Sequence, residues 1–510
     1  MLRNVGQFLS ERARLSPHLE AVVDLEQEVR LDYHALNARA NSAANGLLEA
    51  GVRPGDRVAI LMSNRFEYIE AFYGAAKIGA ITVFLNWRLA AAELEYIVDD
   101  CSASTLVYSA DLAPLAAALK PMAPSITRWI SLGDASDLSY ETLLNASPEE
   151  PSLGAEGDAP VFLMYTSGTT GKPKGAVISH EGSIAWHHAM LATSDTRYGD
   201  RIYTVAPLFH IAGMGIIMSG IYSGGTNVLD ATFDPVRAWQ ILEQEKISGA
   251  LFVPAMLNFM AKVPGAGQGD VSTLRSILCG AAPVPVELIK FFAGLGIDIH
   301  QIYGATETHG GICLMSPEHA LTKAGSTGKA YYGMEVRVVD DAGKDVAPGV
   351  PGEVITRGPH IITEYWNKPD ATAKAFKDGW FYLGDIAEVD TDGFIYIKDR
   401  SKDMIISGGE NIYPAEIEDV VLGHDAVKEV AVIGQPSAKW GESPVAIVVP
   451  KHMNDDLKIL EEDIIALTGN KLARFKQPKA IEFIDEIPRN PSGKALKRVL
   501  RDRFPGPALE

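Results

Sequence analysis

The order of apolar and polar residues predicts alternating strands and helices along the first part of the chain. From residue 32 to residue 51, apolar side chains recur at helical spacing, and Gly51 provides a typical helix end. Further apolar runs predict a strand beginning at Val58, a helix at 67–78, a strand at 81–85, a helix at 91–98 and a strand at 105–108. Strands and helices that alternate at this spacing indicate a mostly parallel, doubly wound sheet.

The same alternation returns after residue 160. The expected elements are a strand at 161–165, a helix at 180–192, strands at 201–206 and 226–229, a helix at 235–245, strands at 249–253 and 275–279, a helix at 285–293 and a strand at 297–302. This second series loosely mirrors the first, although the sequence does not establish a repeat. Between them, residues 133–159 are acidic and rich in serine, proline and glycine, so a loop is expected there.

One stretch resembles a membrane span. No Asp, Glu, Lys or Arg occurs from Ile202 to Leu229, and about 20 apolar residues can cross a bilayer. The stretch also contains Pro207, His210, Asn227 and several glycines, which a membrane span does not favour. We therefore expect a buried strand, a pocket loop, a buried helix and a second strand, with no transmembrane segment.

After about residue 325 the pattern changes. Short strands are expected at 336–339, 352–356 and 380–383, with turns at 341–343 and 390–393, and these indicate a small β unit. The charged segment at 399–403 is expected to interrupt the strands, and a compact α+β pattern follows it. The predicted fold class is α/β: a large N-terminal domain of doubly wound sheets plus a small β unit at 1–398, then a small, mobile α+β domain at 399–510.

Length and composition agree with a globular protein of several cores. A chain of 510 residues is too long for one core, and 47% hydrophobic with 22% charged residues is an ordinary composition. The net charge of −19 argues against nucleic acid or an anionic membrane as the main partner, because both attract basic surfaces.

The cysteines and the chain ends indicate a cytoplasmic protein. Cys101, Cys279 and Cys313 are widely separated and form neither a disulfide framework nor a zinc-binding spacing, which fits a reducing compartment. The first residues lack the apolar core of a signal peptide, and a surface helix is expected there. The final residues are not a peroxisomal signal. Peripheral membrane association is left open, although the acidic segment 133–159 does not support it.

The most informative stretch is residues 163–175, LMYTSGTTGKPKG. An apolar run leads into glycines and hydroxyl residues, and Lys172 and Lys174 follow. Glycines allow backbone N–H groups to turn inward and hold an anion, and hydroxyls and lysines add donors and charge. Lys172 is followed by Pro173, so the stretch is not a Walker loop. We interpret it as a phosphate-binding loop, since a flexible linker would rarely place two lysines directly after a buried strand.

Several separated motifs resemble, in order, those of the adenylate-forming superfamily of acyl- and aryl-CoA synthetases, peptide-synthetase adenylation domains and beetle luciferases. They are the loop 166–175, the acyl-pocket motif 207–210, the adenine-flanking turn 280–283, the nucleotide segment 301–307, the ribose motif 382–385, the hinge 399–403 with 407–411 after it, and the lysine motif 488–494. The stretches KDMIISGGENIYPAEIE and AKWGE are most similar to bacterial fatty acyl-CoA ligases.

The resemblance implies an ATP-dependent acyl-CoA ligase. A carboxylate and ATP give acyl-AMP and pyrophosphate, and CoA then gives acyl-CoA and AMP. A medium- or long-chain fatty acid is expected, because the pocket candidates are mostly small or apolar: His210, Ala212, Gly213, Met214, Gly280, Ala282 and Ala305. The alternatives are an aryl or phenylpropanoid acid-CoA ligase, an acyl-AMP ligase that loads a carrier protein, and a nucleotide-binding protein without turnover.

The resemblance also implies the site residues. Thr166 and Glu307 would hold Mg²⁺, and Lys494, Thr166, Glu307 and His210 would be catalytic. ATP and CoA would be bound by Thr166, Ser167, Gly168, Thr169, Thr170, Gly171, Lys174, Gly280, Ala281, Ala282, Gln301, Ile302, Tyr303, Gly304, Thr306, Asp385, Arg400, Gly408, Gly409, Glu410 and Lys494.

Plainer interpretations stay open for some of these residues. Glu307 and Lys174 could face solvent, Tyr303 could be an ordinary core residue, and His210 could be a buried structural histidine. Arg400 could form an ion pair with a neighbouring aspartate.

The C-terminal domain is expected to move. Lys402 is the predicted hinge, and rotation about it would exchange Lys494 for the CoA channel. Lys494 lies next to Ser492 and Gly493, and an exposed lysine there is also a candidate for a lysine acetyltransferase, because acetylation removes its charge. A homodimer is left open.

Overall fold

The computed structural model describes most of the chain. The described ranges are residues 2–133, 137–166, 172–281, 284–400, 404–451, 457–488 and 495–506. They divide into two compact units, each treated by itself below. The first unit comprises Met1–Trp87, Glu95–Tyr165 and Gly175–Asp399, and the second comprises Arg88–Leu94, Thr166–Lys174 and Arg400–Glu510.

A first sheet, mostly parallel, follows the predicted alternation. Within the described residues its strand order is β7-β6-β5-β3-β4-β8-β9. The strands are β3 (Arg57–Leu61), β4 (Ile81–Phe84), β5 (Thr105–Ser109), β6 (Arg128–Leu132), β7 (Leu138–Ser139), β8 (Pro160–Thr166) and β9 (Lys174–Ser179). The associated helices are α2 (Tyr33–Glu49), α3 (Phe66–Lys77), α4 (Ala91–Asp100), α5 (Ala113–Leu119) and α6 (Tyr140–Leu143).

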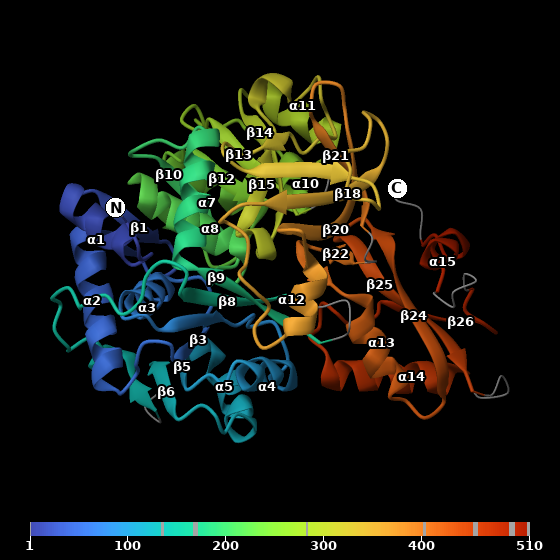
Figure 1. The fold of residues 1–510 in the computed structure, drawn as a ribbon, viewed down its shortest axis with the longest axis horizontal. Helices are drawn as coiled ribbons and strands as arrows, with labels where there is room; N and C mark the ends of the chain where they lie inside the picture. The colour runs from blue at the N-terminus through green and yellow to red at the C-terminus, as the bar shows by residue number, and fades with distance from the viewer. Residues whose placement is uncertain are drawn as a thin grey trace. The chain divides into compact units, whose positions relative to one another are not determined.

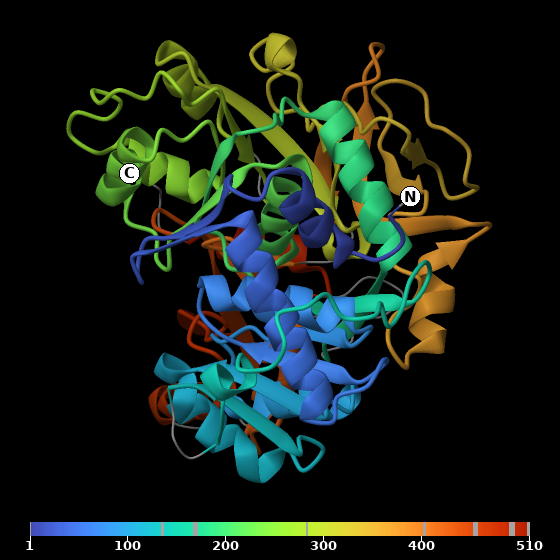
Figure 2. The ribbon, with the colours of Figure 1, turned by 90° about the vertical axis from the view of Figure 1, so that its left-hand side faces the viewer.

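Helix α2 forms as its sequence predicts. Asp32 accepts a hydrogen bond from the backbone N–H of Ala35, which satisfies one of the orphan donors at the helix start. The apolar face of α2 packs against α3, a helix that is buried along its whole length (Figure 1). The blue helices α1 (Gln7–Leu15) and α2 also lie close together (Figure 2). Helical layers of this kind exclude water from a parallel sheet, which explains why its strands are continuous apolar runs.

A second sheet has the order β16-β15-β14-β13-β12-β10-β11-β1-β2 within the described residues. Its strands are β1 (Glu20–Asp24), β2 (Val29–Asp32), β10 (Arg201–Thr204), β11 (Thr226–Leu229), β12 (Gly249–Phe252), β13 (Ser276–Cys279), β14 (Asp298–Ala305), β15 (Gly310–Leu314) and β16 (Lys329–Ala330). Its helices are α7 (His180–Thr193), α8 (Ile211–Ser223), α9 (Pro235–Gln244), α10 (Pro254–Ala261) and α11 (Val286–Gly294).

The charge-free stretch forms the predicted strand, loop, helix and strand. It contains β10, the loop after it, α8 and β11. Helix α8 faces two cores: Met214 and Ile217 pack in the core of the first sheet, and Ile216 packs against the second sheet. Burial on both sides explains the lack of charge. None of the helices in the described residues is both long and apolar enough to cross a membrane.

A smaller, mostly antiparallel sheet confirms the predicted β unit. It contains β17 (Glu335–Val339), β18 (Gly352–Arg357), β19 (Phe376–Lys377), β20 (Trp380–Val389) and β21 (Ile395–Arg400), with α12 (Pro369–Ala375) beside it. Its apolar face packs on the hairpin of β14 and β15, because Val338, Val354 and Ala387 share a cluster with Tyr303 and Ile312.

Two sequence expectations were wrong in part. Residues 133–159 are not simply a loop, since β7 and α6 lie there and Tyr140 and Leu143 are buried. The charged segment at 399–403 does not break the strand at its first residues, because β21 continues through Asp399 and Arg400.

The second unit has the predicted α+β character. Its elements are β22 (Ile405–Ser407), β23 (Glu410–Ile412), β24 (Val427–Ser437), β25 (Gly441–Pro450) and β26 (Ala480–Phe483), with α13 (Pro414–Leu422), α14 (Leu457–Lys471) and α15 (Lys497–Arg503). Apolar side chains of β24 and β25 line both faces of this sheet. The domain limits at 398 and 399 and the hinge stay predictions, and Lys402 lies outside the described residues.

Candidate functional site

The phosphate loop lies between strands β8 and β9, and the structure describes its first and last residues as parts of these strands. Thr166 is the last residue of β8 and Lys174 the first of β9, while the predicted ligands from Ser167 to Gly171 lie outside the described residues. A Cβ atom on Gly175 would lie 3.0 Å from the ring of Tyr165 and 3.3 Å from Cβ of Trp366. Glycine at this position therefore lets the strand leave the loop between two aromatic side chains.

A buried carboxylate anchors the base of this loop. Tyr165 Oη donates to Asp100 Oδ2 at 2.8 Å, and Lys368 Nζ donates to Asp100 Oδ1 at 2.5 Å. Burial raises the pKa of Tyr165 far above its usual value, so its hydroxyl stays a donor. The hydrogen bond to Asp100 raises the pKa of Lys368, so the Lys368 ammonium stays charged at neutral pH.

The nucleotide segment runs along β14 and needs small residues. The predicted ligands here are Gln301, Ile302, Tyr303 and Gly304 on β14, and Thr306 in the turn after it. A Cβ atom on Gly304 would lie 1.9 Å from the carbonyl oxygen of Gly310, and one on Gly280 would lie 2.6 Å from Cγ2 of Ile302. Ala281 follows with a φ angle of +69°, and its predicted neighbour Ala282 lies outside the described residues. Close packing of the backbone thus accounts for both glycines.

Two predicted nucleotide ligands meet in the structure. Tyr303 Oη donates to Asp385 Oδ2 at 2.7 Å, although the two residues lie 82 positions apart. Asp385 is on β20, next to Gly384 with a φ angle of +76°. The tyrosine is 7% exposed, so it is largely a core residue that presents its hydroxyl to the carboxylate.

Glu307 lies in a short turn directly after β14. Its carboxylate Oε1 accepts a hydrogen bond from Tyr365 Oη at 2.9 Å. The turn itself is closed by Thr308, whose Oγ1 accepts from the backbone N–H of Ala305 at 2.9 Å. Tyr365 was not among the predicted site residues, since no local sequence signal links it to a residue 58 positions earlier.

The loop before α8 carries His210, which occupies the N-cap position of that helix. The loop is held by Asn64: its Nδ2 donates to the carbonyl of Ala206 at 3.0 Å, and its Oδ1 accepts from the backbone N–H of Leu208 at 2.9 Å. Asn64 follows β3, and sequence reasoning missed it. A polar residue just past the carboxyl end of a parallel strand is the signal that could have found it.

The acyl-pocket candidates on α8 have a partly structural explanation. A Cβ atom on Gly213 would lie 2.2 Å from the carbonyl oxygen of Pro207, so this glycine allows the helix to pass close to the loop. Ala212 precedes it, and Met214 is fully buried. Ala305, at the end of β14, is half-buried.

A cavity of about 40 Å³ lies on the face of the second sheet that α7 and α8 cover. Its lining residues are Met190, Ser194, Asp195, Thr196, Asp200, Ile202, Ile216, Ser219, Ser248, Gly249, Ala250, Ser276, Leu278 and His300. Side chains two residues apart on a strand share a face. Leu278 and His300 therefore lie on the same face of the second sheet as Gly280 and Ile302. The cavity thus borders the face that carries these predicted site residues.

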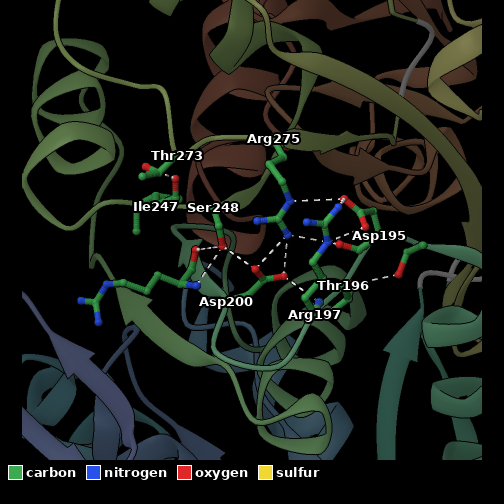
Figure 3. A network of polar contacts seen from close by, with 10 residues as sticks. Asp195, Thr196, Arg197, Asp200, Ile247, Ser248, Thr273 and Arg275 are labelled. Carbon is green, nitrogen blue, oxygen red and sulfur yellow. Dashed lines mark hydrogen bonds and ion pairs between the residues drawn. The ribbon is translucent and has the colours of Figure 1, made fainter.

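Ion pairs join several residues beside this cavity (Figure 3). Arg275 donates to both carboxylate oxygens of Asp200, at 2.8 and 3.0 Å, and to Asp195 at 3.2 Å. Ser248 Oγ also donates to Asp200, at 2.9 Å. A hydrogen bond from Arg197 holds the pKa of Asp195 below its usual value. The cavity is thus lined by apolar side chains such as Met190, Ile216 and Leu278, and it is ionic where these residues meet.

In the second unit, the predicted CoA residues form the turn between β22 and β23. Gly408 and Gly409 have φ angles of +60° and +87°, which favour glycine. The backbone N–H of Gly408 donates to the carbonyl of Trp440 at 2.8 Å. Glu410 begins β23 and is buried, and Arg400 ends β21. Lys494 lies outside the described residues, and the pairing of Thr166 with Glu307 stays a prediction.

Comparison with known proteins gives consistent matches over nearly the whole chain. The AMP-binding enzyme family matches residues 9–366, and the AMP-binding enzyme C-terminal domain matches residues 416–494. A long-chain-fatty-acid–CoA ligase, FadD13 of Mycobacterium tuberculosis, is 43% identical over 99% of each chain. Feruloyl-CoA synthase of an Amycolatopsis species is 39% identical, over 98% of this chain and 99% of that protein. The solved structure of a Mycobacterium tuberculosis fatty acyl CoA synthetase covers 98% of both chains, with 42% identity and a TM-score of 0.76.

Proposed function

The chain belongs to the AMP-binding, adenylate-forming enzyme family as an acid–thiol ligase, and from this premise we propose that its acid is a medium- or long-chain fatty acid. In the first step a carboxylate oxygen attacks the α-phosphorus of ATP, and the bond to pyrophosphate breaks. In the second step the CoA sulfur attacks the acyl carbonyl carbon, AMP leaves with the bonding electrons, and the thiol proton is released to solvent.

Charge on oxygen grows in both steps, so fixed cations and donors should dominate catalysis. We assign Lys174 to the β- and γ-phosphates and Lys494 to the first step. Asp385 can accept hydrogen bonds from the ribose hydroxyls, and Tyr303 fixes the direction of its carboxylate. Arg400 and Thr306 are assigned to ribose or phosphate.

The proposed magnesium ligands fit the chemistry of that ion. Mg²⁺ prefers oxygen donors and usually takes one or two protein ligands together with substrate phosphates. Glu307 and Thr166 supply a carboxylate and a hydroxyl, and the described residues contain no group of three or more His, Cys, Asp or Glu that could hold a metal. When bound, the ion would neutralise charge on the phosphates.

The observation that supports a fatty acid is the cavity beside α7 and α8. From Gly304 back to His300 the strand rises about 13 Å, at roughly 3.3 Å per residue. An extended hydrocarbon advances slightly less than a ~1.5 Å carbon–carbon bond per carbon, so about ten carbons would cover this distance. The cavity of about 40 Å³ would receive only the end of the tail, and the ion pairs of Arg275 would stop it there. A medium-chain acid fits this arrangement best.

An aryl acid is the second candidate, because the relative named feruloyl-CoA synthase is 39% identical. An aromatic acid would occupy the space near Gly280, Ile302 and Gly304 and leave the cavity unused. The two candidates therefore differ in whether the cavity matters for turnover.

The test is a panel of saturated acids of increasing length, together with ferulate and benzoate. We expect pyrophosphate release and CoA consumption to match each other and to be highest for a medium-chain acid. The variant Ile216→Trp fills the cavity and should lower kcat/KM for that acid about tenfold or more, as loss of one pocket contact does. The shortest acids serve as the internal control, because a folding defect would lower turnover of all acids alike. Highest kcat/KM with ferulate, or an equal effect of Ile216→Trp on every acid, would contradict the fatty-acid assignment.

A further inference from the structure

A short segment of the first unit connects two parts of the proposed site. Residues 361–366, called the strap below, run beside β9, the edge strand of the first sheet. The backbone N–H of Thr363 donates to the carbonyl of Val177 at 3.2 Å, and that of Trp366 donates to Gly175 at 2.7 Å. The N–H of Val177 donates back to Glu364 at 3.1 Å. The strap is thus fixed to the strand that leaves the phosphate loop.

The same strap holds Glu307 at two points. The backbone N–H of Ile362 donates to the carbonyl of Glu307 at 2.9 Å, and Tyr365 Oη donates to its carboxylate Oε1 at 2.9 Å. Tyr365 is 6% exposed and belongs to the core of the first sheet. Its ring is therefore fixed by packing, which gives the hydroxyl a defined direction.

A hydrogen bond to a carboxylate in such surroundings is strong and directional. Bonds with one ionised partner are roughly twice as strong as neutral ones, and burial increases the effect. The terminal torsion of a glutamate is otherwise broad, so an unsupported carboxylate samples many directions. Tyr365 selects one of them.

We propose that Tyr365 is a positioning residue, which directs the Glu307 carboxylate towards the metal and phosphates and ties it to the strand after the phosphate loop. The inference rests on the proposed role of Glu307 in magnesium binding. Groups that orient metal ligands commonly change metal affinity or activity 10- to 100-fold when they are lost. The strap would also keep Glu307 in register with Gly175.

The test is Tyr365→Phe, which keeps the ring and removes only the hydroxyl. The matched control is Tyr203→Phe: Tyr203 is fully buried, and its Oη donates to Asp230 Oδ2 at 2.8 Å, a bond of the same type away from the strap. Magnesium binding is measured by calorimetry in the presence of the α,β-methylene analogue of ATP, which cannot transfer its adenylyl group because the methylene bridge replaces the bond that would break. Thermal midpoints of both variants are measured first, and binding is measured below both.

We expect Tyr365→Phe to weaken Mg²⁺ binding and to lower the rate of pyrophosphate release, each about tenfold or more, while Tyr203→Phe changes neither by more than about twofold. Glu307→Gln should reduce both quantities further, and adding Tyr365→Phe to it should have little extra effect, because the two residues act as a unit. Equal Mg²⁺ affinity of Tyr365→Phe and wild type, or full additivity with Glu307→Gln, would overturn the inference. A wild-type enzyme that releases no pyrophosphate with any acid would instead contradict the proposed function.

Discussion

The two large sheets of the first unit share one strand order. In the first sheet β4, β3, β5, β6 and β7 are successive neighbours, and in the second sheet β11, β10, β12, β13 and β14 are in the same order. All of these neighbours pair in parallel. The loose mirroring of element order predicted from the sequence is thus a shared topology. The two sheets differ in the strands that lie beside this shared set and in the connections between those strands.

Each sheet carries two further strands beside the same position. In the first sheet β8 and β9 follow β4, and in the second β1 and β2 follow β11. The connection from β8 to β9 contains glycines, hydroxyls and Lys172, and Lys174 follows as the first residue of β9, whereas the turn from β1 to β2 is Leu25-Glu26-Gln27-Glu28. An acidic turn repels phosphate, so the fold alone does not select the binding loop. The composition of the connection does.

The largest effect we predict is the loss of stability in acid, and it acts where the two sheets meet. His187 and His309 are fully buried, their rings lie 5.4 Å apart, and the His309 ring is 5.6 Å from Phe162 of the first sheet. Burial lowers the pKa of His187 to about 4 and that of His309 well below its usual value. The nearby His180, whose Nδ1 accepts from the backbone N–H of Val5 at 3.0 Å, also has a pKa lowered to about 4 by burial.

Between pH 6.5 and 4 the unfolded chain binds more protons at these histidines than the folded chain does. The contribution of these neutral, buried histidines to the free energy of unfolding is therefore fully present above about pH 6.5. It falls by several kcal/mol as the pH drops towards 4. Denaturant unfolding at a series of pH values measures this. His187→Phe keeps an aromatic ring without a titrating group, so its stability should depend less steeply on pH. An unchanged slope in the variant would show that His187 is not responsible for the loss of stability.

Much of the fold could be predicted because burial leaves a periodic record in the sequence. Most helices and strands of the first unit lie within a few residues of their predicted positions, and the charge-free stretch was assigned correctly. The failures have physical causes. Helix α6 lies within a polar, acidic segment, and only Tyr140 and Leu143 connect it to the core. The strand β1 pairs with β11, about two hundred residues later, and such a contact has no local signal.

The candidate site shows the same limit. Motifs identified residues such as Glu307 and Asp385, because their neighbours in sequence form a recognisable pattern. They did not identify Tyr365 or Asn64, which act through hydrogen bonds to distant segments. A short motif indicates which residues carry chemistry, and only the tertiary structure shows what orients them.

The second prediction separates the two equivalent connections. Lys174→Ala should lower the rate of pyrophosphate release about 100-fold or more, since loss of one fixed group that stabilises transition-state charge has an effect of this size. Glu26→Gln changes a charge in the equivalent turn and should leave the rate within about twofold. Rates are measured at saturating ATP and acid. Similar effects of the two variants would mean that position in the fold, and not the composition of the loop, determines phosphate binding.

The smallest predicted effect compares two tyrosine–aspartate bonds, one in each sheet. Tyr108 Oη of β5 donates to Asp137 Oδ2 at 2.8 Å, and Tyr303 Oη of β14 donates to Asp385 Oδ2 at 2.7 Å. If Asp385 binds the ribose hydroxyls, Tyr303→Phe should raise the KM for ATP about tenfold, which corresponds to roughly 1.4 kcal/mol for one hydrogen bond to a charged group. The kcat should change little, because the ribose is remote from the reacting phosphorus. Tyr108→Phe should lower the free energy of unfolding by a similar amount, roughly 1.4 kcal/mol, which appears as a lower thermal midpoint. It should change neither kinetic constant. If Tyr303→Phe also left the KM for ATP unchanged, Tyr303 would be an ordinary core residue like Tyr108. The assignment of Asp385 to the ribose would then lose its structural support.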